Sequence, residues 1–339
     1  MKNLVILGAG TAGTMMANHL VKKLNKKEWQ ITLVDQFKSH YYQPGFLFIP
    51  FGTYQPEDVK RTIDEFLPKG IQLIREKIDR IDKDTDTVIL ENGRNVKYDI
   101  LIIATGCKIA PEEVPGMKGD TWQKNIFDFY TFEGSCALAK KLETWPGGKL
   151  VVHITEMPIK CPVAPLEFAF LADDYFTKKG MRDKVEISYV TPLSGAFTKE
   201  KCTKALEYLL KDKNIKIVPD FAVEHIEGEN GKMFDYGGEV VDFDLLVTVP
   251  TNMGDECILR SGFGDDLNYV PTDKNTLQSK VKENIFVIGD ATNVPASKAG
   301  SVAHFEAEIL TENILKYIEG KPLNPKFDGH ANCFIETGK

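Results

Sequence analysis

The amino-acid sequence predicts an α/β fold with two doubly wound, mainly parallel β-sheets. The length of 339 residues suits about two domains. Short apolar runs alternate with segments of helical periodicity, and the alternation occurs twice along the chain. Because strands that alternate with helices form parallel sheets, each of the two series predicts one such sheet.

The first series begins at the second residue. It is expected to contain three buried strands and one helix: strands 2–7, 31–34 and 98–104, and helix 11–24. An aromatic and proline-rich loop occupies residues 39–54, and residues 72–74 and 87–90 suggest a small antiparallel excursion.

The second series begins near residue 149. Its expected elements are strands 149–154, 184–190 and 244–249, and helices 164–177 and 199–210. A final buried strand, 285–288, precedes a helix over residues 300–319. Glu306, Glu308, Glu312 and Lys316 predict one solvated face on that helix. We therefore expect one domain of residues 1–110 plus 285–339, with residues 111–284 inserted as the second domain.

Composition excludes several classes of protein. The net charge of -7, without basic runs, disfavours a nucleic-acid partner. We find neither a signal peptide nor the run of about 20 apolar residues that spans a bilayer. The six cysteines form no C-x-x-C pair, so we expect neither a metal site nor a disulfide framework. The expected location is cytoplasmic, or peripheral on a membrane.

A glycine-rich turn lies between the first strand and the first helix. Gly8 allows the tight turn, Gly10 lets a pyrophosphate approach the backbone, and Gly13 permits close packing of helix on strand. The positive end of the helix dipole favours phosphate there. Asp35 ends the second strand, where its carboxylate can accept a ribose hydroxyl proton, although a solvated aspartate is the alternative. The nucleotide-contacting set is Gly8, Ala9, Gly10, Thr11, Ala12, Gly13, Asp35 and Gln36.

Two later motifs complete a resemblance that covers nearly the whole chain. Ala104-Thr105-Gly106 closes one buried strand, and Gly289-Asp290 closes another. With the glycine turn, they occur in the order and spacing typical of flavoproteins with two dinucleotide-binding (Rossmann-like) domains. The resemblance implies FAD, held by the residues Ala104, Thr105, Gly106, Gly289, Asp290, Lys298 and Gly300, with Asp290 on the ribityl chain. The helix that opens at Gly300 favours negative charge on the reduced flavin.

The second domain has no glycine motif after its first strand. Residues 155–158 are bulky there, and Pro158 has no N–H to donate. Enzymes that take hydride from NAD(P)H are therefore disfavoured. The segment Lys160-Cys161-Pro-x-Ala-Pro instead resembles sulfide:quinone oxidoreductases and the flavoprotein subunit of flavocytochrome c sulfide dehydrogenases. Cys333 resembles the other redox cysteine of that group, and Glu167 matches one of its acidic positions.

The residues around Cys161 independently support its interpretation as a redox cysteine. Cys161 follows Lys160 and precedes a helix, and both features favour a thiolate, although a buried, inert cysteine is the alternative. Glu167, expected two turns along that helix, is a candidate general base, with a solvated glutamate as the alternative. No metal ligand is expected.

The resemblance implies FAD-dependent oxidation of sulfide to sulfur or polysulfide through a redox-active disulfide of Cys161 and Cys333, with electrons passed to quinone. A flavocytochrome c-type dehydrogenase, or a flavoprotein that acts as a sulfur carrier or redox sensor, remains the alternative. A homo-oligomer is possible. Residues 41–51 could line a quinone slot or pack over the flavin. Cys333 lies six residues from the last residue, which favours a shortened chain over an unusual electron acceptor.

Overall fold

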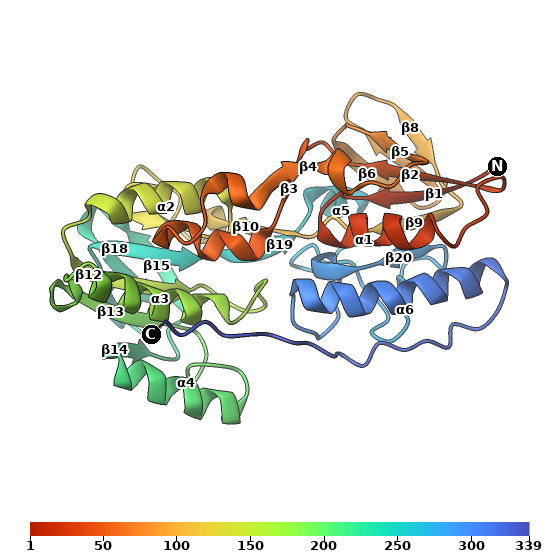
Figure 1. The fold of residues 1–339 in the computed structure, drawn as a ribbon. Coiled ribbons are helices and arrows are strands. Elements are labelled where there is room, and N and C mark those ends of the chain that lie inside the picture. Colours follow the sequence, from red (N-terminus) through yellow and green to blue (C-terminus); the bar gives the residue numbers. More distant parts are fainter. Residues whose placement is uncertain (339) are drawn as a thin grey trace. The chain divides into compact units, whose positions relative to one another are not determined.

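The computed structural model describes residues 1–338, which divide into two compact units. Unit 1 contains residues 1–41, 60–108 and 253–332, and unit 2 contains residues 42–59, 109–252 and 333–338. Figure 1 labels most of their helices and strands. Two short paired strands, β10 (Cys107–Ala110) and β19 (Thr251–Gly254), lie where the chain passes from one unit to the other.

The sheet of unit 1 has five parallel strands in the order β20-β9-β1-β2-β5. Their bounds are β1 (Lys2–Leu7), β2 (Trp29–Val34), β5 (Ile71–Ile74), β9 (Ile100–Ile103) and β20 (Ile285–Val287). The chain starts at the central strand β1, winds outward to β5, and then returns to the other side of β1. The first doubly wound sheet is thus confirmed.

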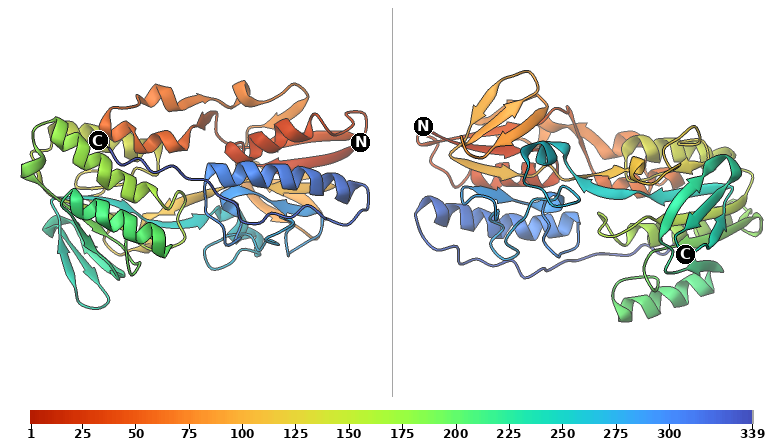
Figure 2. Two further views of the ribbon diagram at one scale, coloured as in Figure 1. Left: turned by 60° about the horizontal axis from the view of Figure 1, so that its bottom comes forward. Right: turned by 180° about the vertical axis from the view of Figure 1, so that it is seen from behind.

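Side chains alternate between the two faces of this sheet. Leu4 and Ile6 pack with α1 (Thr11–Leu20) and α6 (Gly300–Ile318), which lie side by side in Figures 1 and 2. Val5 and Leu7 face a three-stranded antiparallel sheet and a short helix. These elements are β6 (Ile78–Asp82), β7 (Thr87–Leu90), β8 (Asn95–Lys97) and α5 (Glu256–Ser261). An antiparallel strand pair, β3 (Ser39–Tyr41) and β4 (Lys60–Thr62), completes unit 1.

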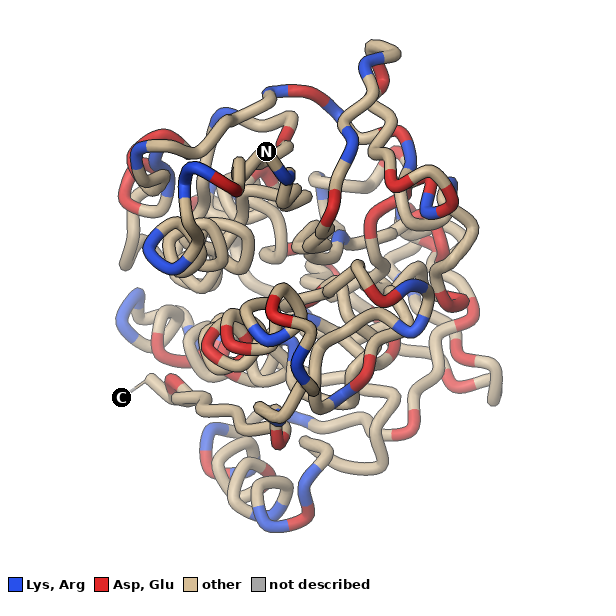
Figure 3. The backbone as a smooth tube through the Cα atoms, turned by 90° about the vertical axis from the view of Figure 1, so that its right-hand side faces the viewer, with Lys and Arg blue, Asp and Glu red and all other residues tan. Residues whose placement is uncertain are grey.

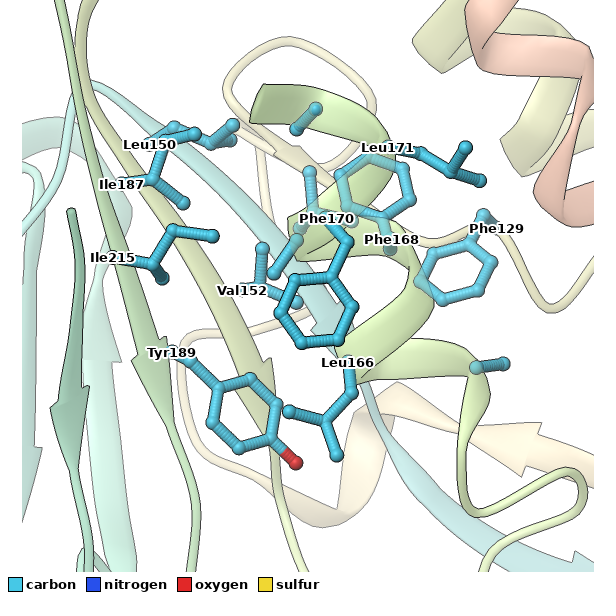
Figure 4. Close-up of a cluster of buried hydrophobic side chains, with 14 of the residues drawn as sticks. Phe129, Leu150, Val152, Leu166, Phe168, Phe170, Leu171, Ile187, Tyr189 and Ile215 are labelled. Carbon is cyan, nitrogen blue, oxygen red and sulfur yellow. The ribbon is translucent and has the colours of Figure 1, made fainter. Parts of the chain in front are cut away.

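Unit 2 repeats this plan with five parallel strands in the order β11-β18-β12-β13-β14. Their bounds are β11 (Ile126–Phe127), β12 (Gly148–Ile154), β13 (Val185–Val190), β14 (Ile215–Val218) and β18 (Leu245–Val249). Figure 4 shows Phe170 and Leu166 of α3 (Ala164–Lys178) facing Val152 and neighbouring strand residues, whereas Phe168 lies toward Phe129. The second predicted parallel sheet is confirmed.

The helices α2 (Phe132–Thr144) and α4 (Glu200–Asp212) contribute to the same core as α3. Val151 and Leu246 point to the other face, which an antiparallel sheet covers. Its strands are β15 (Val223–Glu227), β16 (Lys232–Asp235) and β17 (Val240–Asp242). Acidic and basic residues are interspersed over the backbone in Figure 3.

Two details differ from the expectations. Residues 72–74 belong to β5, which pairs in parallel with β2, so their assignment to an antiparallel excursion was wrong; Thr87–Leu90 does pair antiparallel. The compact units also divide at other residues than the expected domains. Cys257 and Ile258 pack under the first sheet, which places residues 253–284 in unit 1. Phe51 packs against Phe168 with tilted rings, 4.9 Å between ring centroids, and residues 42–59 belong to unit 2.

Candidate functional site

The glycine turn of unit 1 is shaped by two very close backbone contacts. A Cβ on Gly8, where φ is +97°, would lie 2.4 Å from the carbonyl oxygen of Ala104, and one on Gly13 would lie 1.9 Å from that of Gly8. Both positions therefore need glycine to let the turn, the β9 strand end and α1 meet. Gly10 is different, because a Cβ there would meet no other part of residues 1–338 within 4 Å.

Asp35 lies at the end of β2 and is tied to the glycine turn. Its Oδ2 accepts a 2.6 Å hydrogen bond from the N–H of Ala9, and its Oδ1 accepts one of 2.7 Å from the N–H of Phe37. Burial raises the pKa of this carboxyl. Asp35 is therefore not the solvated aspartate of the alternative interpretation. His40 adds a second tie to the turn, since its Nδ1 lies 3.1 Å from the carbonyl oxygen of Ala9. Gln36 is exposed.

A second turn follows β20, at residues 289–292. Gly289 has a φ of +70°, and its missing Cβ leaves room for Ala12 of α1 at 3.2 Å. The buried Lys298 ammonium donates to the carbonyl oxygens of Asp290 at 3.0 Å and of Thr292 at 2.7 Å. Cys107 Sγ lies 3.9 Å from Asp290 Oδ2. Gly300 opens α6 as expected and is exposed.

These features fit a dinucleotide. The N-terminal residues of α1, Gly10 and Thr11, are exposed, so their N–H groups can meet phosphate oxygens. Thr105, after β9, has a buried hydroxyl oxygen without a hydrogen-bond partner among residues 1–338. A buried hydroxyl normally has a partner, and a bound ligand would supply one. All the residues expected to hold FAD lie in unit 1.

In unit 2, Cys161 lies in a short loop before α3 with an unusual backbone. Its φ is +48°, which is uncommon for a residue other than glycine and is often found at functional sites. Several contacts hold this conformation. The Cys161 carbonyl oxygen accepts hydrogen bonds from Ala164 N at 3.0 Å and from the Tyr130 hydroxyl at 3.1 Å, while Lys160 N donates to Asn252 Oδ1 at 3.0 Å. The Cys161 side chain is half-buried, unlike that of a core cysteine.

Glu167 lies in the first turn of α3, because the helix begins at Ala164. The expectations of a place two turns along the helix and of a possible solvated side chain were therefore wrong, since Glu167 is only 7% exposed. Burial raises the pKa of its carboxyl, the hydrogen bond from the Glu336 N–H lowers this pKa, and the charge of the Glu336 carboxylate raises it. Glu167 Oε1 accepts a hydrogen bond from the C-terminal segment.

Cys333 lies on that C-terminal segment and is exposed. Partial burial and the Glu167 carboxylate raise the pKa of its thiol. The segment is fixed nearby, because Ile335 packs against the hydrophobic core of unit 2. The structure thus brings Cys333 into the electrostatic range of Glu167, on the helix that follows Cys161. No group of three or more metal-binding side chains occurs within residues 1–338.

Several known proteins resemble this chain over part or nearly all of its length. Residues 2–152 match the pyridine nucleotide-disulphide oxidoreductases. The chain as a whole is similar to several oxidoreductases. It is 28% identical to a mitochondrial sulfide:quinone oxidoreductase of Dictyostelium discoideum, over 98% of this chain and 75% of the relative. It is 29% identical to a type II NADH:quinone oxidoreductase of Staphylococcus aureus, over 94% of this chain and 83% of the relative.

Among proteins with solved structures, the sulfide:quinone oxidoreductase of Aquifex aeolicus has the same fold. The TM-score is 0.82 at 24% sequence identity, over 95% of this chain and 78% of that one. Within residues 1–338, no helix combines the length and the apolar character that a bilayer crossing requires.

Sequence reasoning placed Glu306 on the solvated face of the last helix, and this was wrong. Glu306 is 1% exposed, and its Oε2 accepts a 2.7 Å hydrogen bond from Gly289 N. The signal was present in the spacing, because position 306 falls on the same helical stripe as Ala303 and Leu310. An acidic residue on an apolar stripe indicates a buried partner.

Proposed function

We propose that this protein is an oxidoreductase that binds FAD in unit 1 and oxidises sulfide through Cys161 and Cys333. The observation that carries the proposal is the arrangement around α3: Cys161 in a fixed, left-handed backbone conformation before the helix, and Cys333 beside Glu167 in the first turn. The name of the Dictyostelium relative supports sulfide and quinone as the substrates.

The turns of unit 1 would hold FAD in the following way. Gly10 and Thr11 would bind the pyrophosphate, Asp35 a ribose hydroxyl, and Asp290 the ribityl chain; Thr105 would gain a partner for its buried hydroxyl. Bound FAD supplies the acceptor for two electrons and passes them on to quinone.

The protein's own thiols would carry the sulfur. Sulfide attacks one sulfur of a Cys161–Cys333 disulfide, so a new S–S bond forms as a persulfide while the old S–S bond breaks and the other cysteine leaves as a thiolate. A second sulfide then attacks the outer sulfur of the persulfide, so that a hydrogen disulfide leaves as the shortest polysulfide and both cysteines become thiolates. Loss of two electrons from the two thiolates re-forms their disulfide, and bound FAD would be the oxidant that accepts these electrons. Glu167 is placed to accept the proton of Cys333.

A hydride from NADH is the competing electron source, because the Staphylococcus relative uses NADH. The residues that follow β12 and β18, where a second dinucleotide would bind, argue against NADH as the electron source. Instead of glycines, residues 155–158 follow β12, and the Glu156 carboxylate accepts a 2.5 Å hydrogen bond from Thr251 after β18. A carboxylate at this point opposes the binding of phosphates.

The test is anaerobic reduction of the purified, FAD-loaded protein. Sulfide should bleach the absorbance of oxidised flavin near 450 nm, and a soluble quinone should then restore it. NADH at the same concentration should leave the spectrum unchanged over that time. Rapid bleaching by NADH and none by sulfide would reject the sulfide proposal and favour an NADH dehydrogenase. Co-purification with a haem subunit would favour cytochrome c as the acceptor.

A further inference from the structure

Two side chains hold the turn after β20. One binds a backbone N–H, and the other binds backbone carbonyl oxygens. Glu306 Oε2 accepts the N–H of Gly289 at 2.7 Å. Lys298 Nζ donates to the carbonyl oxygens of Asp290 and Thr292, at 3.0 and 2.7 Å. One acidic and one basic side chain therefore satisfy three backbone groups of a single turn, whose second residue is Asp290.

Both side chains are buried, so neither is placed to serve as an exposed ligand contact. Lys298 is 6% exposed, and Glu306 is 1% exposed. The Lys298 ammonium also lies 3.8 Å from the ring centroid of Tyr269, which is 2% exposed. A cation–π contact and two carbonyl oxygens occupy this ammonium. The expected direct contact between Lys298 and the cofactor is thus less well supported than a role beneath the turn.

The turn has little freedom to adopt another conformation. Gly289 has a positive φ, and the space for its missing Cβ is taken by Ala12 at 3.2 Å and Ala303 at 3.9 Å. The turn is therefore packed between α1 and α6. Loss of the Glu306 contact would leave a confined N–H without its acceptor, and such a group costs more than the bond itself contributes.

The charge of Glu306 depends on pH in an accessible range. Burial raises the pKa of Glu306 to about 8, with a further upward contribution from Asp290 and downward ones from Lys298 and from the Gly289 hydrogen bond. Asp290 and Lys298 are the charged groups that act on it from the neighbouring segments. At neutral pH the carboxyl is mostly protonated, and in alkaline solution its negative charge repels Asp290.

We propose that Glu306 and Lys298 are positioning residues, which hold the turn of residues 289–292 so that Asp290 faces the bound dinucleotide. The proposal rests on the proposed binding of FAD in unit 1. Glu306 would thus affect the affinity for the cofactor without contacting it. Lys298, which was expected to contact the cofactor, would instead stabilise the turn.

The experiment compares Glu306→Gln, Glu306→Leu and Lys298→Met with the wild type. Glutamine keeps an oxygen acceptor and loses the titratable proton, whereas leucine loses both. Glu312→Gln is the matched control, because Glu312 is an exposed carboxylate on the same helix. Far-UV circular dichroism and the melting temperature check folding. The readouts are bound flavin per chain and the FAD dissociation constant, from flavin fluorescence after dilution of the holoprotein, at pH 6.5 and pH 9.

We expect Glu306→Leu and Lys298→Met to weaken FAD binding by about tenfold or more at both pH values. The wild type and Glu312→Gln should lose affinity several-fold between pH 6.5 and pH 9, and Glu306→Gln should lose none. A folded Glu306→Leu protein with wild-type affinity would overturn the proposal. If Glu306→Leu does not fold, a wild-type pH profile in Glu306→Gln would overturn it instead. A wild type that binds no FAD would reject the proposed function itself, which is a distinct outcome.

Discussion

The main-chain N–H of Glu336 donates a 2.9 Å hydrogen bond to Glu167 Oε1. This bond joins the C-terminal segment that carries Cys333 to the first turn of α3. It gives Glu167 two tasks, since the same carboxyl anchors the segment and raises the pKa of the Cys333 thiol. Substitutions at Glu167 must therefore separate anchoring from proton transfer.

Glu167→Gln makes that separation, because the glutamine amide oxygen can still accept the Glu336 N–H. Burial raises the pKa of Glu167, so a base role is lost as pH falls through that raised value. We expect the wild-type rate of sulfide oxidation to decline on this acidic side. Glu167→Gln should lower the rate about a hundredfold and abolish the decline. The measurement is the pH dependence of flavin reduction by sulfide in single turnovers.

Glu336→Gln is the companion variant. Its backbone N–H is retained, but the negative charge that raises the pKa of Glu167 is removed. The acidic decline should therefore shift to lower pH while the maximal rate is kept. An unshifted profile in Glu336→Gln, together with a normal rate in Glu167→Gln, would argue that Glu167 only anchors the segment.

Cys161→Ser and Cys333→Ser should each abolish sulfide turnover and leave the flavin content unchanged, since the FAD residues lie in unit 1 and the two cysteines in unit 2. The double variant should be no worse than either single one, because the two thiols would act as one unit. Cys202→Ser is the control, as Cys202 is also exposed. The paired mechanism would be abandoned if either single variant turned over sulfide at a near wild-type rate.

Asp290→Ala and Asp35→Ala should both lower the bound flavin. Asp35→Ala also removes the acceptor of two backbone N–H groups, at Ala9 and Phe37, so it should lower the melting temperature as well. Asp266→Ala, at an exposed position, is the control. Flavin absorbance per chain and thermal unfolding are the measurements. Full flavin content in both variants would remove these aspartates from the proposed site.

The stability of the protein should depend on the ionisation of Glu306. Its pKa is raised from an ordinary value of 4.5 to about 8, so the folded protein holds a proton that the unfolded chain has lost. This contribution is fully present below pH 4.5 and declines as pH rises toward 8, by at most about 1.4 kcal/mol per pH unit. In Glu306→Gln the decline should be absent. Urea unfolding of both proteins between pH 5 and pH 9 tests this; parallel curves would contradict it.

Most of the fold could be predicted from periodicity, because each buried strand is a short apolar run. β1, for example, has the expected bounds. The identity of β5 was missed, since a short edge strand leaves no pattern that distinguishes parallel from antiparallel pairing. The bounds of the compact units depend on long-range contacts such as Phe51 with Phe168, which no local pattern predicts.

The site was predictable only in part, for the same reason. Glycine spacing and the strand-end position of Asp35 indicate a nucleotide turn, since local geometry determines both. The burial of Glu306 and the bond between Glu336 and Glu167 link segments distant in sequence. No local sequence pattern predicts the hydrogen bond between Glu336 and Glu167. The position of Glu306 on the apolar stripe of its helix, in contrast, did indicate a buried side chain.

The open space around Gly10 has a consequence for how this chain tolerates change. Gly8 and Gly13 are demanded by folding, because a methyl group on either would strike backbone. At Gly10 the φ of -73° suits any residue, and an alanine would meet no other part of residues 1–338 within 4 Å. Folding alone therefore gives no reason for glycine at position 10. A descendant that no longer binds a dinucleotide could accept other residues at this position and keep its fold. The residue at position 10 therefore indicates whether the ligand is still bound.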